Sequence, residues 1–302
     1  MNIAIIGGTG LLGSNLVNLY AKRNINVLAF SRADAANIQS KYNQVIDFTN
    51  LESSLNNSFE TFRPNIIINA IALVNLEKCE EDIDLCQHSN VDIAKVLAHL
   101  AKEYKSYFIH ISTDHFYQDT ILKHTEKEPL ILRNNYARTK KEAERQVLKI
   151  NFKTLIVRTN IIGFRRTQVP SFFEWLLHAL ENQTPIHLFK DFFTSPIDVK
   201  ILGDLLLQCY EKKLTGVYNI ASSEVINKYT FGLEMAKVFN FSSSCIQESS
   251  IIEFQKNSSI QRATSLGLDV TKIEIALGVS MPSIETTLKN LLAEYTGDNS
   301  HG

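Results

Sequence analysis

The chain has 302 residues, which is long enough for one large α/β unit or for two smaller domains. Its 31 Lys and Arg residues nearly balance its 32 Asp and Glu residues, so we expect no nucleic-acid surface. No apolar stretch reaches the roughly 20 residues of a membrane helix, and no signal-peptide pattern is visible. We therefore expect a cytoplasmic protein with no membrane association. The four cysteines lack metal-ligand spacing, which predicts free thiols and no metal site.

The first half of the chain alternates short apolar runs with amphipathic helices. Strands are predicted at 3–6, 27–30, 45–46, 66–70, 107–112 and 155–158, with helices at 12–20, 51–62, 94–101 and 136–148. This alternation is typical of a parallel sheet covered on both faces. The second half is less regular, with helices predicted at 171–182, 198–212, 229–239 and 283–296 and strands at 185–188 and 217–220.

These patterns predict an α/β protein with two parts. We expect a doubly wound, Rossmann-like parallel sheet over residues 1–159, joined again by residues 199–225. The smaller C-terminal α/β lobe, over residues 160–302, is expected to bind the substrate.

Glycine is concentrated at the junction of the first strand and helix. Four of the 12 glycines lie within the segment Gly7-Gly8-Thr9-Gly10-Leu11-Leu12-Gly13. Gly7 allows a tight turn, Gly10 lets a diphosphate approach the backbone, and Gly13 lets the helix pack on the strand. The free N–H groups and the dipole of the first helical turn favour negative charge. The segment therefore predicts a dinucleotide site.

The end of the second strand bears on the choice of dinucleotide. An acid at this position binds the ribose hydroxyls of NAD, whereas an Arg accommodates the 2′-phosphate of NADP. The strand ends Phe30-Ser31-Arg32, so Ser31 and Arg32 favour NADPH. Asp34 leaves NADH open, and the alternative interpretation of Arg32 is a solvated surface residue.

A Tyr-Lys pair and a threonine predict a proton-donating site. Tyr136 and Lys140 are four residues apart on a predicted helix and so share one face. An ammonium beside a phenol should lower the pKa of the tyrosine, which suits it to proton transfer near neutral pH. Thr113 follows the fifth strand, at the sheet edge where ligands of such folds bind, and can donate a hydrogen bond to a carbonyl.

The chain resembles the extended short-chain dehydrogenase/reductases and, within them, the dTDP-4-dehydrorhamnose reductase family. Besides the glycines, the matching segments are Asp47-Phe48, Arg63-Pro64-Asn65, Asn69-Ala70-Ile71-Ala72, Ser112-Thr113-Asp114, the Tyr136/Lys140 pair, Arg158-Thr159 and Gly216-Val217-Tyr218-Asn219. The resemblance implies NAD(P)H-dependent reduction of the C4 ketone of a nucleotide-linked 4-keto-6-deoxy sugar. Such a reaction belongs to deoxysugar and cell-surface polysaccharide biosynthesis. A homodimer is a further expectation.

The resemblance also implies roles for single residues. Tyr136 would protonate the new alkoxide, Lys140 would hold the nicotinamide ribose and tune Tyr136, and Thr113 would orient the ketone oxygen. Asp47 would bind the adenine amino group. The other residues implied at the cofactor are Phe48, Ala70, Ile71, Ala72 and Asn90, and those implied at the substrate are Val74, Asp114, His115, Asn160 and Arg262.

Three segments on the substrate side depart from the pattern of the family, namely Arg158-Thr159-Asn160-Ile161, Ser195-Pro196-Ile197 and Arg262-Ala263-Thr264-Ser265. A different nucleotide sugar therefore stays open. So does an epimerase or dehydratase of the same fold, in which His115 would replace the Glu that follows Thr-Asp in a dehydratase. The alternative for His115 is an ordinary pocket or surface histidine. A third alternative is a non-catalytic, NADP-binding regulatory subunit.

Overall fold

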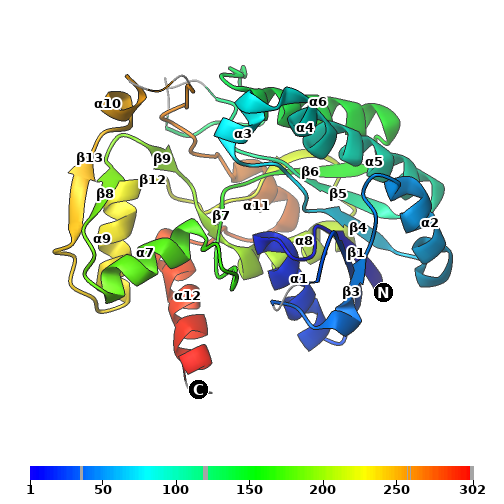
Figure 1. The fold of residues 1–302 in the computed structure, drawn as a ribbon, viewed down its shortest axis with the longest axis horizontal. Coiled ribbons are helices and arrows are strands. Elements are labelled where there is room, and N and C mark those ends of the chain that lie inside the picture. The colour runs from blue at the N-terminus through cyan, green and yellow to red at the C-terminus, as the bar shows by residue number, and fades with distance from the viewer. Residues whose placement is uncertain (35–36, 118–121, 257, 259, 300–302) are drawn as a thin grey trace.

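A seven-stranded parallel sheet forms the centre of the larger unit (Figure 1). The computed structural model describes residues 1–34, 37–117, 122–256, 258 and 260–299. The sheet has the order β11-β6-β5-β4-β1-β2-β3 and every neighbouring pair is parallel. Its strands are β1 (Asn2–Ile6), β2 (Asn26–Ser31), β3 (Asn43–Val45), β4 (Ile66–Asn69), β5 (Tyr107–Ile111), β6 (Thr154–Arg158) and β11 (Gly216–Asn219).

Helices cover both faces of this sheet. Side chains alternate between the faces of a strand, so Ile3 and Ile5 of β1 join one apolar cluster while Ala4 and Ile6 join the other. The first cluster packs against α1 (Leu11–Lys22) and α8 (Val199–Glu211), and the second against α2 (Leu51–Phe62), α5 (Ile93–Glu103) and α6 (Asn135–Ile150). The predicted Rossmann-like sheet is confirmed.

The sequence analysis did not predict two short helices that precede α5. They are α3 (Leu76–Glu81) and α4 (Ile83–Gln87), followed by the π-helical turn η2 (His88–Asp92). The side chains of Asn75 and Asp82 cap the two helices by accepting hydrogen bonds from the backbone N–H groups of Lys78 and Leu85. Each helix is too short to show amphipathic periodicity, so only these capping residues could have indicated them.

The second lobe has a core of its own. It is built from α7 (Phe172–Glu181), β8 (Ile186–Phe189), α9 (Lys228–Val238), β13 (Ile246–Ser249) and α12 (Ile284–Asn299), which lie together on the left of Figure 1. The helices predicted at 171–182, 198–212, 229–239 and 283–296 and the strand predicted at 185–188 are all present, and each end lies within three residues of the prediction. The remaining short elements are η1 (Ser40–Tyr42), β7 (Ile161–Ile162), β9 (Phe193–Thr194), β10 (Ile197–Asp198), β12 (Ile226–Asn227), α10 (Ile251–Gln255) and α11 (Thr271–Leu277).

The chain returns to the large sheet after entering the second lobe. Helix α8 packs against α1, and β11 pairs with β6 at the edge of the sheet. The division into domains at residues 159, 199 and 225 stays a prediction. Among the described residues, no helix combines the length and apolar character that crossing a membrane requires.

Candidate active site

Two adjoining cavities lie at the carboxyl ends of the central strands. The glycine-turn cavity, of about 410 Å³, is lined by residues that include Gly7, Thr9 and Gly10. The tyrosine cavity, of about 440 Å³, is lined by residues that include Thr113 and Tyr136. Both cavities are lined by Gly10, Ala70, Ile71, Ala72 and Arg165, so they form one continuous cleft.

The glycine turn has the backbone geometry that the sequence predicted. Gly7 has a φ of +95°, which side-chain-bearing residues rarely adopt, and its N–H donates to the carbonyl of Phe30 at 2.9 Å. A Cβ on Gly13 would lie 2.2 Å from the carbonyl oxygen of Gly7, so helix α1 can approach the turn only with glycine there. Gly10 caps α1 without a side chain, which leaves the first-turn N–H groups facing the cleft. A diphosphate fits this cradle.

Most of the residues predicted at the cofactor line the cleft. Ser31 and Arg32 lie at the end of β2, where Ser31 is buried and held by a hydrogen bond to Asn43 while Arg32 is exposed. The predicted residues that line one cavity or the other are Gly7, Thr9, Gly10, Leu11, Leu12, Ser31, Arg32, Phe48, Ala70, Ile71 and Ala72.

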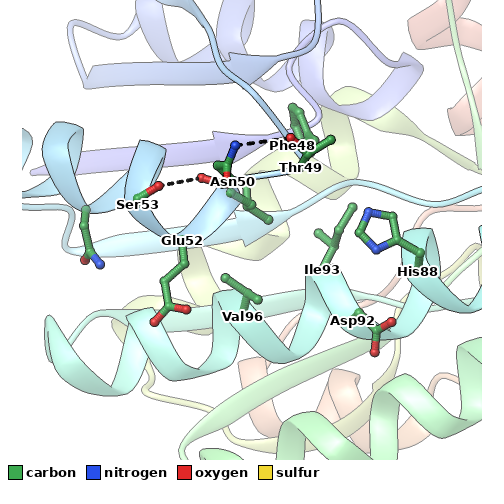
Figure 2. A pocket seen from close by; sticks show the side chains of 11 residues that line it. Phe48, Thr49, Asn50, Glu52, Ser53, His88, Asp92, Ile93 and Val96 are labelled. Carbon is green, nitrogen blue, oxygen red and sulfur yellow. Dashed lines mark hydrogen bonds between the residues drawn. The ribbon is translucent and has the colours of Figure 1, made fainter.

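A further cavity, of about 550 Å³, continues the cleft beyond Phe48 (Figure 2). It lies between the start of α2 and the η2–α5 segment, and it shares Phe48, His88 and Ile93 with the glycine-turn cavity. Asp47 precedes Phe48 and is exposed. Its carboxylate accepts hydrogen bonds from Thr49 and Asn50, and these bonds hold the pKa of Asp47 below its ordinary value. Its contact with adenine stays a prediction.

Asn90 lies behind the wall of the cleft and does not line it. Its Oδ1 accepts a hydrogen bond from the N–H of Leu73 at 2.8 Å, and its Nδ2 donates to Oγ1 of Thr139 at 3.0 Å. Asn90 belongs to the π-helical turn η2, a distortion found frequently at functional sites. The residue therefore ties the loop after β4 to helix α6, which carries Tyr136.

Thr113 and Tyr136 meet in the tyrosine cavity. Tyr136 lies in the first turn of α6, whose N-cap Asn134 accepts a hydrogen bond from the N–H of Ala137. Burial raises the pKa of Tyr136, and a hydrogen bond with Thr113 lowers it by a smaller amount. The sequence predicted a lowered pKa through Lys140. The structure differs because burial outweighs the other influences and Lys140 is not among them.

Lys140 is buried and its ammonium is directed to the end of β5. Its Nζ donates a hydrogen bond to the carbonyl of Ile111 at 2.7 Å. Burial lowers the pKa of Lys140 to about 8, while Glu144 opposes this shift. Glu144 in turn accepts two hydrogen bonds from the buried Arg158, at 2.9 and 2.7 Å, and one from Ser112 at 2.7 Å. This buried network joins α6 to the ends of β5 and β6.

Polar residues predicted at the substrate form one wall of the tyrosine cavity. Asp114 is buried and accepts a hydrogen bond from Asn160 at 2.8 Å, and burial raises the pKa of its carboxyl. The ring of His115 meets that of Tyr136 edge to face at 5.7 Å, and burial lowers the pKa of His115. Val74 lines the same cavity and is exposed. No three His, Cys, Asp or Glu side chains in the described part of the chain are grouped to hold a metal ion.

Arg262 lies outside the cavity lining. Its guanidinium forms an ion pair with Glu77 of α3 at 2.6 Å, which joins the second lobe to the larger unit. A substrate contact of Arg262 stays a prediction.

Several residues of the second lobe were missed by the sequence analysis. Ile161, Arg165, Ser171 and Phe172 line the cleft. Lys228, in the first turn of α9, lies over the ring of Phe172 at 4.2 Å, and burial lowers its pKa to about 8 while Asp114 opposes the shift. No local motif marks these residues, because only the packing of the second lobe brings them to the cleft.

Comparison with known proteins places the chain in a family. A family model described as RmlD substrate binding domain matches residues 1–297. The chain belongs to this family. It is 24% identical over 316 residues to a dTDP-4-dehydrorhamnose reductase of Aggregatibacter actinomycetemcomitans, covering 96% of this chain and 98% of the relative.

The chain is also similar to a second relative and to a solved structure. The chain is 25% identical over 314 residues to methionine adenosyltransferase 2 subunit beta of Mus musculus, covering 98% of this chain and 88% of that protein. Its fold is similar to the crystal structure of a dTDP-4-dehydrorhamnose reductase from Bacillus anthracis in complex with NADP, with a TM-score of 0.85 and 21% identity. That similarity covers 97% of this chain and 99% of the other.

Proposed function

We propose that the protein is an NAD(P)H-dependent reductase of the C4 ketone of a nucleotide-linked 4-keto-6-deoxy sugar, acting in deoxysugar and cell-surface polysaccharide biosynthesis. The observation that carries this proposal is the continuous cleft, in which Thr113, Tyr136 and Lys140 line the cavity that opens onto Gly10. A relative whose name is dTDP-4-dehydrorhamnose reductase, matching nearly the whole chain, supports the same reaction.

When bound, NAD(P)H would supply a hydride to the ketone carbon. Because burial keeps the pKa of Tyr136 high, its phenol is protonated at neutral pH and carries the proton that the ketone oxygen requires. Thr113, which hydrogen-bonds the phenol, orients that oxygen. Lys140 lines the same cavity and is charged below a pH of about 8, and its ammonium would hold the nicotinamide ribose beside Tyr136.

The preferred cofactor is NADPH, with NADH as the alternative. Arg32 lies at the end of β2 and lines the glycine-turn cavity, where its guanidinium can bind a ribose 2′-phosphate. Gly7, Thr9, Gly10, Leu11 and Leu12 would hold the diphosphate at the start of α1. Ser31, Asp47, Phe48, Ala70, Ile71 and Ala72 would line the rest of the cofactor site, and Gly13 and Asn90 would act by holding its walls in place.

The substrate would occupy the tyrosine cavity. Val74, Asp114, His115 and Asn160 line the tyrosine cavity and would contact the sugar. A homodimer and a cytoplasmic location remain expectations. Size-exclusion chromatography with light scattering tests the homodimer.

A turnover assay tests the proposed reaction. The purified protein is incubated with NADPH and a panel of 4-keto-6-deoxy nucleotide sugars, and the loss of NADPH absorbance is followed. We expect turnover with at least one sugar, and its loss in Tyr136→Phe, which removes only the phenolic hydroxyl. Sugar conversion without NADPH consumption would instead identify an epimerase or dehydratase. NADPH binding without turnover of any sugar would favour a regulatory subunit, the class that the similarity to methionine adenosyltransferase 2 subunit beta keeps open.

A further inference from the structure

Arg165 lies where the two cavities of the cleft join. It follows β7 in the second lobe, and it lines both the glycine-turn cavity and the tyrosine cavity. The other four residues that line both cavities are Gly10, Ala70, Ile71 and Ala72, none of which carries a charge. Arg165 therefore supplies the charged side chain at the point where a dinucleotide would pass the glycine turn.

The backbone of Arg165 is fixed from two sides. Its carbonyl accepts a hydrogen bond from Nδ2 of Asn37 at 3.1 Å, and the same Nδ2 donates to the carbonyl of Thr9 at 3.1 Å. One amide group thus ties the Arg165 loop directly to the glycine turn. The N–H of Arg165 donates to Oε1 of Glu174 at 3.0 Å, which anchors the loop to α7. The base of the side chain is held in place before any ligand arrives.

Among the residues that the structure describes, the guanidinium of Arg165 has no hydrogen-bond or ion-pair partner. Its Nε is buried and makes no hydrogen bond, and no carboxylate lies within ion-pair distance of it in the described part of the chain. A buried N–H group without an acceptor is unfavourable, and a guanidinium is well suited to bind phosphate oxygens through two parallel hydrogen bonds. The neighbouring Arg166 differs, because its guanidinium pairs with Glu294 at 2.6 Å.

We propose that Arg165 binds the diphosphate of the dinucleotide cofactor from the side opposite the glycine turn. The inference rests on the proposed function, since it assumes that the cleft takes NADPH. The first-turn N–H groups of α1 bind one side of the diphosphate and the guanidinium of Arg165 binds the other. The second lobe thereby contributes to cofactor binding as well as to substrate binding.

Binding measurements on Arg165→Gln test this assignment without turnover. We expect the Kd for NADPH, measured by fluorescence titration, to rise roughly 10- to 100-fold through loss of charge-assisted hydrogen bonds. The Kd for adenosine 2′-phosphate, which has no diphosphate, should stay unchanged when measured by competition. Arg166→Gln is the matched control, because it removes the same charge from the same loop, and its Kd for NADPH should equal that of the wild type. Circular dichroism verifies that both variants are folded.

Each other outcome overturns the assignment. An unchanged Kd for NADPH in Arg165→Gln shows that the guanidinium does not contact the cofactor. Equal weakening of NADPH and adenosine 2′-phosphate indicates general damage to the site. Weaker binding of a nucleoside diphosphate such as dTDP, with NADPH unaffected, assigns Arg165 to the substrate. If the wild-type protein itself binds no NADPH, the proposed function fails together with this inference, which distinguishes that case from the others.

Discussion

Removing the guanidinium of Arg158 should destabilise the fold strongly. Its side chain and that of Glu144 are 2% and 1% exposed, and they are joined by hydrogen bonds of 2.9 and 2.7 Å. Arg158→Met keeps an unbranched side chain of similar length but removes the buried cation, so that the Glu144 carboxylate keeps only Ser112 and the partly exposed Lys141, at 3.2 Å. Breaking a buried ion pair in this way costs about 3–5 kcal/mol. We expect the free energy of unfolding at pH 7 to fall by that amount.

Urea denaturation followed by circular dichroism measures this loss, and its pH dependence provides a second test. Burial alone would raise the pKa of Glu144, but the hydrogen bonds and the charge of Arg158 outweigh it and hold that pKa below its ordinary value of 4.5. A lowered pKa in the folded state contributes stability that is present above pH 4.5 and is lost as the pH falls through the folded-state value. The difference in the free energy of unfolding between the wild type and Arg158→Met should therefore become smaller in acid.

The control is a more exposed ion pair on α6, the helix that carries Glu144. Arg145 and Glu142 are joined at 2.6 Å, and the side chain of Arg145 is 58% exposed. Because exposed pairs contribute little to stability, Arg145→Met should leave the urea midpoint within experimental error. Equal losses in the two variants, or a loss below about 1 kcal/mol in Arg158→Met, would refute the reasoning that burial makes the Arg158 pair important.

Two other predictions concern the cleft. Gly13→Ala should lower the free energy of unfolding by about 1–3 kcal/mol and weaken NADPH binding, because the new Cβ would lie 2.2 Å from the carbonyl oxygen of Gly7. Wild-type stability and affinity in calorimetry would contradict this. The kcat should decline as the pH rises through about 8, because the ammonium of Lys140 then loses its proton. A flat kcat profile between pH 7 and 9.5 would show that this charge does not limit the reaction.

The strands, helices and glycine turn of the larger unit could be predicted from the sequence, because each depends on residues that are close together in the chain. The apolar alternation of β1, the stripe of α1 and the glycines between them predict a strand, a helix and a phosphate-binding turn without reference to distant residues. The spacing of Tyr136 and Lys140 likewise places both on one helix face. These features depend on period and on backbone freedom, which are properties of short segments.

Other features of the site depend on contacts between distant residues, so only the tertiary structure decided them. Burial among Leu76, Cys79, Cys86 and Ile260 raises the pKa of Tyr136, whereas helix spacing alone predicted the opposite direction. Arg262, whose contact with the substrate stays a prediction, is paired with Glu77 of α3. Arg165 reaches the cleft through hydrogen bonds to Asn37 and Glu174. Sequence fixes which groups are available, but desolvation and charge pairing depend on which distant groups surround them.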